Sequence, residues 1–393
     1  MPTAKSSLKP PCHRQVMIVA GEASGDMYGA GLVQAMQRKL HGLTFCGVGG
    51  KYMRQAGVKI IYPAEDLAVV GLFEVFSQLG HIRQALKILT GRLRRKRPAL
   101  LILIDFPDFN LILAKRAGKL GIPVFYYISP QVWAWRSGRV KTIAQRVNKL
   151  AVILPFEQAF YEDRGVVDKV EFVGHPLVDA VHPTLTAAEF RQRHAIGHGT
   201  VIGLVPGSRK KEISAILPDF IAAARLLRRE NKGITFLLPL APSLDIADLN
   251  LAPADAANLN IRIIRHERYN VMAACDLVMA ASGTVTLELA ILQIPMVVAY
   301  RISPLTYFVG RRLIKAKYAA LVNLIAGREV VKELLQGELT ADNMQRELRR
   351  IWPGTEEYQK TRQALAKVSA SLGPPGASAN AAALALSLMG KAV

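Results

Sequence analysis

The chain has 393 residues, 51% of them hydrophobic, and a formal net charge of +21 at pH 7. This length suits two domains that each bury a sizeable core, and the longest apolar runs fall far short of the roughly 18 residues of a membrane-spanning helix. The positive charge predicts an anionic partner or surface, and three cysteines without metal-ligand spacing argue against structural zinc.

Residues 1–14 are predicted to form a disordered tail. The apolar stretch that follows, 16–20, leads straight into the first domain and is too short for the apolar region of a signal peptide. We therefore expect a cytoplasmic protein, and the odd number of cysteines fits a reducing compartment.

Short apolar runs alternate with helical patterns along the chain, which is typical of parallel sheets covered by helices on both faces. The fold class expected is α/β, with two doubly wound, Rossmann-like domains in tandem. We predict these domains at 15–174 and 175–350, with the helices of 351–393 packing back on a domain. Strands are predicted at 16–20, 44–48, 100–104, 124–128, 149–154, 170–173, 201–205, 235–238, 261–264, 277–280 and 296–299.

The first strand runs into Gly21-Glu22-Ala23-Ser24-Gly25-Asp26, after which a helix is expected. Small residues allow a tight turn and leave the N-terminus of the helix open to a ligand. The alternative is a purely structural turn in which Ser24 or Asp26 caps the helix.

The segment from Leu72 to Leu93 carries apolar residues at helical spacing, and a basic run that ends at Arg97 follows it. A helix packed on a core is the ordinary explanation of such a stripe. The residues before it are unusually apolar for a loop, and a basic apolar surface is what a peripheral membrane protein needs. The residues expected to contact a membrane are Val69, Val70, Leu72, Phe73 and Phe76.

The strand at 100–104 is apolar throughout and ends in Asp105-Phe106-Pro107-Asp108-Phe109-Asn110. A strand of this kind is expected at the centre of a sheet, and its carboxyl end is where open α/β sheets bind ligands. Carboxylates at that place are suited to accepting a proton from a hydroxyl group. The alternative is that Asp105 or Asp108 only caps the following helix.

Two strand-to-helix turns in the second half predict a site for a nucleotide diphosphate. One is Pro206-Gly207-Ser208-Arg209, which continues into two lysines, and the other is Ala281-Ser282-Gly283-Thr284. Such turns present backbone N–H groups and the positive ends of helix dipoles to a negatively charged ligand.

Taken together, the chain resembles the lipid-A-disaccharide synthase family, glycosyltransferases of the GT-B fold. The resemblance runs from about Val16 to Gly337 and rests on six motifs in the order of the family. These are the four motifs quoted above, Ser129-Pro130-Gln131-Val132-Trp133-Ala134-Trp135-Arg136, and Asn323-Leu324-Ile325-Ala326-Gly327-Arg328-Glu329.

The resemblance implies two domains that face each other across a cleft and an inverting transfer from UDP-2,3-diacylglucosamine to 2,3-diacylglucosamine 1-phosphate (lipid X). It implies Asp108 as the general base, with Asp105 as the other candidate. The residues implied for the UDP-sugar are Gly207, Ser208, Arg209, Ser282, Gly283, Thr284, Glu288 and Asn323. Those implied for the sugar substrates in the other domain are Glu22, Ser24, Gly25 and Asp26.

The chain contains no Asp-X-Asp pair of the kind that holds a metal under a sugar nucleotide. We therefore expect no metal and no cofactor, with Arg209 and helix dipoles stabilising the leaving group. The partners expected are the two acylated sugars and the anionic cytoplasmic face of the inner membrane of a Gram-negative bacterium, and an oligomer is compatible with the sequence.

Two other functions compete with this interpretation. One is another GT-B enzyme that acts on UDP-N-acetylglucosamine. The other is nucleic-acid binding, which the charge permits but which we do not expect, because leucine and valine, rather than base-stacking aromatic residues, accompany the basic clusters.

Overall fold

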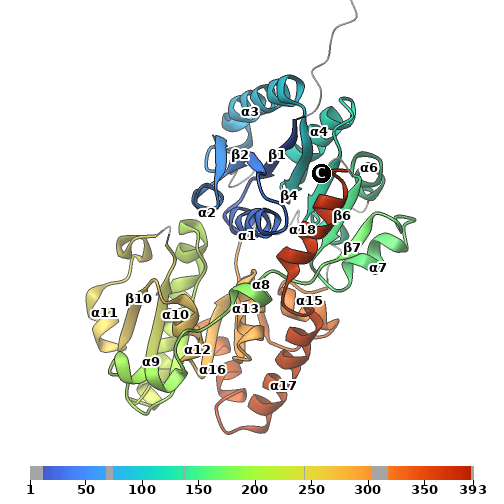
Figure 1. The fold of residues 1–393 in the computed structure, drawn as a ribbon. Coiled ribbons are helices and arrows are strands. Elements are labelled where there is room, and N and C mark those ends of the chain that lie inside the picture. The colour runs from blue at the N-terminus through green and yellow to red at the C-terminus, as the bar shows by residue number, and fades with distance from the viewer. Residues whose placement is uncertain (1–11, 68–73, 136–137, 243, 303–316, 391–393) are drawn as a thin grey trace, which may run out of the picture. The chain divides into compact units, whose positions relative to one another are not determined.

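The computed structural model describes residues 12–67, 74–135, 138–242, 244–302 and 317–390. The chain divides into two compact units, one made of residues 1–176 with 374–393 and the other of residues 177–373. Each unit contains one parallel sheet between helices, so the predicted α/β class is confirmed (Figure 1).

The amino-terminal unit has a seven-stranded sheet in the order β3-β2-β1-β4-β5-β6-β7. Its central strands are fully buried because helices cover both faces, which explains their continuous apolar sequences. The strands are β1 (Cys12–Ala20), β2 (Thr44–Gly49), β3 (Val58–Pro63), β4 (Pro98–Ile104), β5 (Val124–Tyr127), β6 (Lys149–Val152) and β7 (Val170–Phe172).

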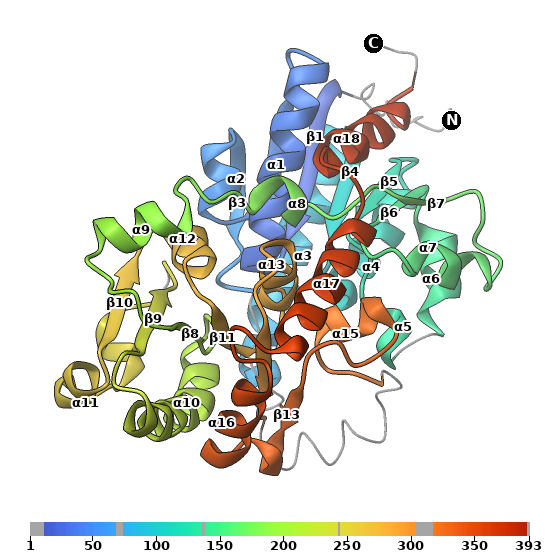
Figure 2. The ribbon, with the colours of Figure 1, turned by 90° about the horizontal axis from the view of Figure 1, so that it is seen from below.

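One face of this sheet packs against α3, α4 and α6, where Leu89, Leu113 and Ile143 belong to one buried apolar cluster with β1 and β4. Helices α1 and α18 lie side by side, although they come from opposite ends of the chain (Figures 1 and 2). The helices are α1 (Ala23–Lys39), α2 (Lys51–Gln55), α3 (Glu74–Lys96), α4 (Pro107–Gly118), α5 (Val132–Trp135), α6 (Arg139–Arg146), α7 (Glu157–Glu162) and α18 (Ala377–Ser387).

The second unit has a six-stranded sheet in the order β10-β9-β8-β11-β12-β13. Helices α10 and α16 pack against each other and share one buried apolar cluster with the strands of this sheet. The strands are β8 (Val201–Val205), β9 (Thr235–Leu240), β10 (Ile261–Arg265), β11 (Leu277–Ala281), β12 (Met296–Tyr300) and β13 (Glu333–Leu335). The helices are α8 (Leu177–Ala180), α9 (Ala187–Arg193), α10 (Lys210–Glu230), α11 (Pro253–Asn258), α12 (Arg268–Ala273), α13 (Val285–Ile291), α15 (Leu321–Ala326), α16 (Ala341–Arg350) and α17 (Glu356–Ser371), with short 3-10 helices at Ile246–Leu249 and Gln336–Glu338.

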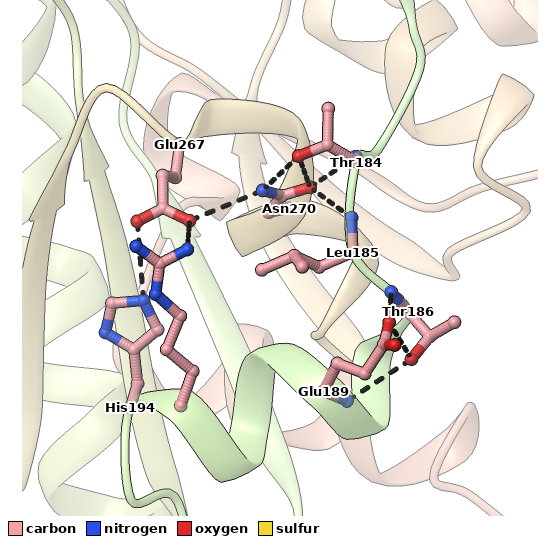
Figure 3. A network of polar contacts seen from close by, with 8 residues as sticks. Thr184, Leu185, Thr186, Glu189, His194, Glu267 and Asn270 are labelled. Atoms are coloured by element: carbon pink, nitrogen blue, oxygen red, sulfur yellow. Dashed lines mark hydrogen bonds and ion pairs between the residues drawn. The ribbon is translucent and has the colours of Figure 1, made fainter.

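The segment that enters the second unit is tied to α12 by the network in Figure 3. The Asn270 side-chain oxygen accepts hydrogen bonds from the backbone N–H groups of Thr184 (2.7 Å) and Leu185 (3.2 Å). His194 lies 3.5 Å from the Glu267 carboxylate. These contacts explain why the unit begins before its first strand, close to the boundary predicted after residue 174.

Three details differ from the predictions. Strand β1 begins at Cys12, which pairs with Pro98, so the end of the predicted disordered tail belongs to a strand. Strands β3 and β13 were not predicted, since both are short edge strands that carry polar residues such as Lys59 and Glu333. Of the helices after residue 351, α17 belongs to the second unit and α18 to the first.

Candidate active site

Both candidate sites lie where the strand order of a sheet reverses. In the amino-terminal unit this point is between β1 and β4, and in the second unit it is between β8 and β11. Ligands of open α/β sheets bind at the carboxyl ends of the strands at such points. All four strand-to-helix turns predicted to carry function are therefore at the expected place in the fold.

The turns after β1 and β4 touch each other. A Cβ atom at Gly21 would lie 2.6 Å from Cγ of Phe106, so only glycine fits beside this ring. Gly25 packs the first turn of α1 against the sheet, where a Cβ atom would lie 3.4 Å from the side chains of Ala20 and Ile104. The two motifs therefore form one surface.

The turn after β4 has an unusual backbone. Asp105 and Phe106 both have left-handed φ angles, of 44° and 47°. Residues other than glycine rarely adopt this conformation. The Asn110 amide donates to the carbonyl oxygens of Asp105 (2.7 Å) and Ile104 (3.1 Å), and the Tyr126 hydroxyl donates to that of Asp105 (2.5 Å). Three hydrogen bonds, one buried and two partly buried, thus hold a strained turn in place.

The two candidate bases have different surroundings. Burial raises the pKa of Asp105 to about 6, and the nearby Glu22 carboxylate adds to this shift. The Asp108 side chain is 72% exposed, stands in the first turn of α4 and forms an ion pair with Arg139 of α6. Asp108 is thus the more accessible of the two carboxylates.

The structure places Asp26 differently from the prediction that it faces a sugar. Its carboxylate accepts hydrogen bonds from the backbone N–H groups of Gly50 (2.6 Å), Tyr52 (2.9 Å) and Met53 (3.1 Å). It is 4% exposed. Asp26 therefore caps the N-terminus of α2, because a carboxylate there satisfies amides that lack partners within the helix.

The motif from Ser129 to Trp135 follows β5, the neighbour of β4. The Trp133 indole N–H donates to Glu157 at 3.1 Å, and the same carboxylate accepts the backbone N–H groups of Ile153 (3.2 Å) and Leu154 (3.0 Å). Burial raises the pKa of Glu157 to about 7. Sequence reasoning missed Glu157, whose only signal is a glutamate at the start of the helix that follows an apolar strand.

In the second unit, the turn after β8 leads into a long helix. Gly207 has a left-handed φ of 112°, Ser208 and Arg209 are exposed, and Arg209 is the N-cap residue of α10. Lys210 forms an ion pair with Asp248 at 2.7 Å. The predicted diphosphate turn therefore presents a helix N-terminus and a cationic side chain at the carboxyl end of β8.

The turn after β11 is at the neighbouring strand end. The Ser282 hydroxyl donates to the carbonyl oxygen of Ala319 at 2.8 Å, and a Cβ atom at Gly283 would meet no described atom within 4 Å. Thr284 is the N-cap residue of α13. Glu288 is only 2% exposed and forms an ion pair with Arg268, and burial raises its pKa. The carboxylate of Glu288 is therefore buried and paired with a cation.

Asn323, which was predicted to bind the UDP-sugar, is fully buried. Its side-chain oxygen accepts the N–H groups of Val330 (2.7 Å) and Val331 (3.0 Å), and its amide donates to the Val331 carbonyl oxygen and to Glu333 (both 2.8 Å). Asn323 therefore holds the end of the loop of residues 327–329, and a role in binding stays a prediction.

The structure describes none of the side chains that were predicted to contact the membrane. Val69, Val70, Leu72 and Phe73 lie outside the described residues, and Phe76 belongs to α3 without a described side chain. Farther along α3, Leu86, Leu89 and Leu93 are buried in the core, whereas Arg94, Arg95 and Lys96 are exposed. No helix in the described part of the chain has the length and apolar character needed to cross a membrane.

Comparison with known proteins decides the family. The family model described as Lipid-A-disaccharide synthetase matches residues 16–386. A curated lipid-A-disaccharide synthase from Geobacter metallireducens is 46% identical over 381 residues, which cover 96% of this chain and 98% of that protein. The chain belongs to the lipid-A-disaccharide synthase family.

Solved structures support the fold expected of a lipid-A-disaccharide synthase. The UDP-GlcNAc 2-epimerase from Neisseria meningitidis, bound to UDP-GlcNAc, has a TM-score of 0.61 at 15% identity and covers 93% of this chain and 97% of its own. The calicheamicin glycosyltransferase has a TM-score of 0.60 at 14% identity, covering 96% and 98%. These likenesses show the fold alone, and the predicted GT-B class is confirmed.

The family also decides between the glycosyltransferase alternatives. The epimerase shares only its fold with this chain, whereas the relative from Geobacter metallireducens shares nearly half of the aligned residues over almost the full length. Among the described residues there is no group of three or more His, Cys, Asp or Glu side chains that is arranged to hold a metal ion. The expectation that no metal takes part stays a prediction.

Proposed function

We propose that this chain joins UDP-2,3-diacylglucosamine to 2,3-diacylglucosamine 1-phosphate, giving lipid A disaccharide 1-phosphate and UDP. The 6-hydroxyl of the acceptor attacks the anomeric carbon of the donor sugar, the bond to the UDP oxygen breaks, and carbon 1 inverts. The observation that carries this proposal is the family match over residues 16–386.

The proton of the attacking hydroxyl goes to Asp108. Support for this role comes from its position at the carboxyl end of β4, its exposure of 72% and its ion pair with Arg139 of α6. Asp105 remains the second candidate, because a pKa of about 6 suits a general base.

The UDP diphosphate binds to Arg209 and to the backbone N–H groups around Gly207 and Ser208. A guanidinium group and a helix N-terminus together stabilise the charge that develops on the leaving group. Ser282, Gly283 and Thr284 line the same site from the neighbouring strand end. Glu288 takes the ribose hydroxyls once Arg268 releases it.

The amino-terminal unit attaches reversibly to the anionic cytoplasmic face of the inner membrane. Arg94, Arg95 and Lys96 are exposed in the last turn of α3, and each basic residue near such a surface contributes about 1 kcal/mol. Reversing these three charges is expected to abolish salt-sensitive cosedimentation with phosphatidylglycerol vesicles. Phosphatidylcholine vesicles serve as the control, and undiminished binding of the variant contradicts the proposal.

A direct assay tests the function. The purified chain is supplied with UDP-2,3-diacylglucosamine and lipid X, and UDP and the tetraacyl disaccharide phosphate are measured. Both products are expected in equal amounts. If the chain instead turns over UDP-N-acetylglucosamine and leaves the acylated sugars unchanged, it is a different enzyme of the same fold.

A further inference from the structure

The turn between β8 and α10 contains a carboxylate at the place proposed for the diphosphate. Glu212 is the third residue of α10, and its side chain folds back over the turn, where the Ser208 backbone N–H donates to Oε2 at 3.3 Å. A protein anion therefore contacts a backbone amide that the nucleotide also needs.

Gly207 makes this contact possible. Its φ of 112° lies in the left-handed region, and a Cβ atom there would lie 2.1 Å from Glu212 Oε2 and 2.5 Å from Cδ. Any side chain at this position would strain the backbone and collide with the carboxylate. The glycine thus leaves the space that the Glu212 carboxylate occupies.

The start of α10 attracts an anion for two reasons. The first N–H groups of a helix lack partners within it, and the dipole of this 21-residue helix is positive there. The N-cap residue is Arg209, whose side chain has no acceptor atom to offer those amides. Glu212 supplies an acceptor just before the helix, at the N–H of Ser208, the residue that precedes the N-cap.

The carboxylate accepts a long hydrogen bond from the turn. Its length of 3.3 Å exceeds the usual 2.7–3.2 Å. Burial raises the pKa of Glu212, while the charge of Arg209 and the backbone N–H groups of Ser208 and Arg209 act in the opposite direction. A diphosphate offers more charge and more acceptor oxygens to these same groups, so we expect it to replace the carboxylate there.

We propose that Glu212 is an internal anion that occupies the diphosphate position in the empty protein and leaves it when UDP or the UDP-sugar binds. The inference rests on the proposed function, because it uses the diphosphate position assigned there to Gly207, Ser208 and Arg209. Since two anions at the same amides repel each other, Glu212 lowers the affinity for UDP and favours release of this product.

The test compares ligands that do and do not carry phosphate. Calorimetry measures the binding of UDP, pyrophosphate and uridine to the full-length protein, Glu212→Gln and Glu212→Ala. We expect both variants to bind UDP and pyrophosphate about tenfold more tightly, with the affinity for uridine unchanged. Glu230→Gln removes the same charge at the other end of α10 and is expected to change none of the three.

Glu212→Gln keeps an acceptor oxygen of the same shape, so it tests the charge even if Glu212→Ala fails to fold. Equal or weaker binding of UDP by Glu212→Gln overturns the inference and makes Glu212 a residue that only supports the turn. Arg209→Ala separates this failure from that of the proposed site. If Arg209→Ala weakens UDP binding while Glu212→Gln leaves it unchanged, only the inference fails, and if neither variant changes it, the diphosphate position is wrong.

Discussion

The Trp133 indole N–H donates a hydrogen bond to the Glu157 carboxylate at 3.1 Å. This bond joins α5, in the segment after β5, to the first residue of α7. The carboxylate is 1% exposed and also accepts two backbone N–H groups. A buried carboxylate with three donors fixes this loop beside the turn that carries Asp105.

This relationship predicts a pH dependence of stability. The pKa of Glu157 is raised from 4.5 to about 7 in the folded protein, so the folded state binds this proton more tightly than the unfolded state. The contribution of Glu157 to the free energy of unfolding is fully present below about pH 4.5 and is lost as the pH rises through about 7. Urea unfolding across this range measures it.

Glu157→Gln is the variant for that measurement. The glutamine cannot ionise, and its amide nitrogen faces backbone donors, so we expect a loss of about 1–3 kcal/mol and a flatter pH profile. Asp105 titrates in both proteins, and because the two carboxylates repel each other, the difference between the proteins includes this coupling. An identical pH dependence of unfolding for the two proteins would show that Glu157 does not titrate in this range.

The assignment of the base predicts a second result. Asp108→Asn should lower kcat by about 10²- to 10⁴-fold, because general base catalysis is worth that much, while the protein remains folded. Asp163→Asn replaces an exposed aspartate at the end of α7 and should leave kcat unchanged. Initial rates and circular dichroism check both variants.

Asp105→Asn distinguishes the alternative. If Asp105 is the base, kcat of the parent protein should decrease as the pH drops below about 6, because this carboxylate takes up a proton there. Asp105→Asn should then lose most of its activity, and its remaining kcat should no longer show this pH dependence. Normal activity of Asp108→Asn would transfer the role to Asp105.

The buried position of Asn323 predicts a structural effect. Asn323→Ala leaves the Val330 and Val331 N–H groups without their acceptor, which should cost about 2–4 kcal/mol of stability. Thermal unfolding with and without UDP checks this. A variant that is as stable as the parent protein but does not bind UDP would show that Asn323 contacts the nucleotide directly.

Chelation provides the last prediction. Because Arg209 and the helix N-terminus are assigned to the leaving group, EDTA should leave the rate of disaccharide formation unchanged. Product formation in metal-depleted buffer, with and without EDTA, measures it. Loss of activity that magnesium restores would require a metal at the diphosphate.

The local sequence determined which stretches become strands and which turns carry function. Strands buried on both faces need continuous apolar runs, and ligand-binding turns need glycine and small polar residues. Residues 100–110 and 201–209 show both features, so their structure could be predicted from the sequence. The order of the motifs along the chain also identified the family.

Only the tertiary structure decided where individual polar side chains point. Asp26 lies in a motif that suggests a ligand, yet its carboxylate caps a helix from another segment. The side chain of Asn323 forms hydrogen bonds with the backbone of a loop and with Glu333. Glu157 had no motif of its own, and its partner Trp133 is 24 residues away. Such roles depend on contacts between distant segments, because burial leaves a polar atom only the partners that the fold brings to it.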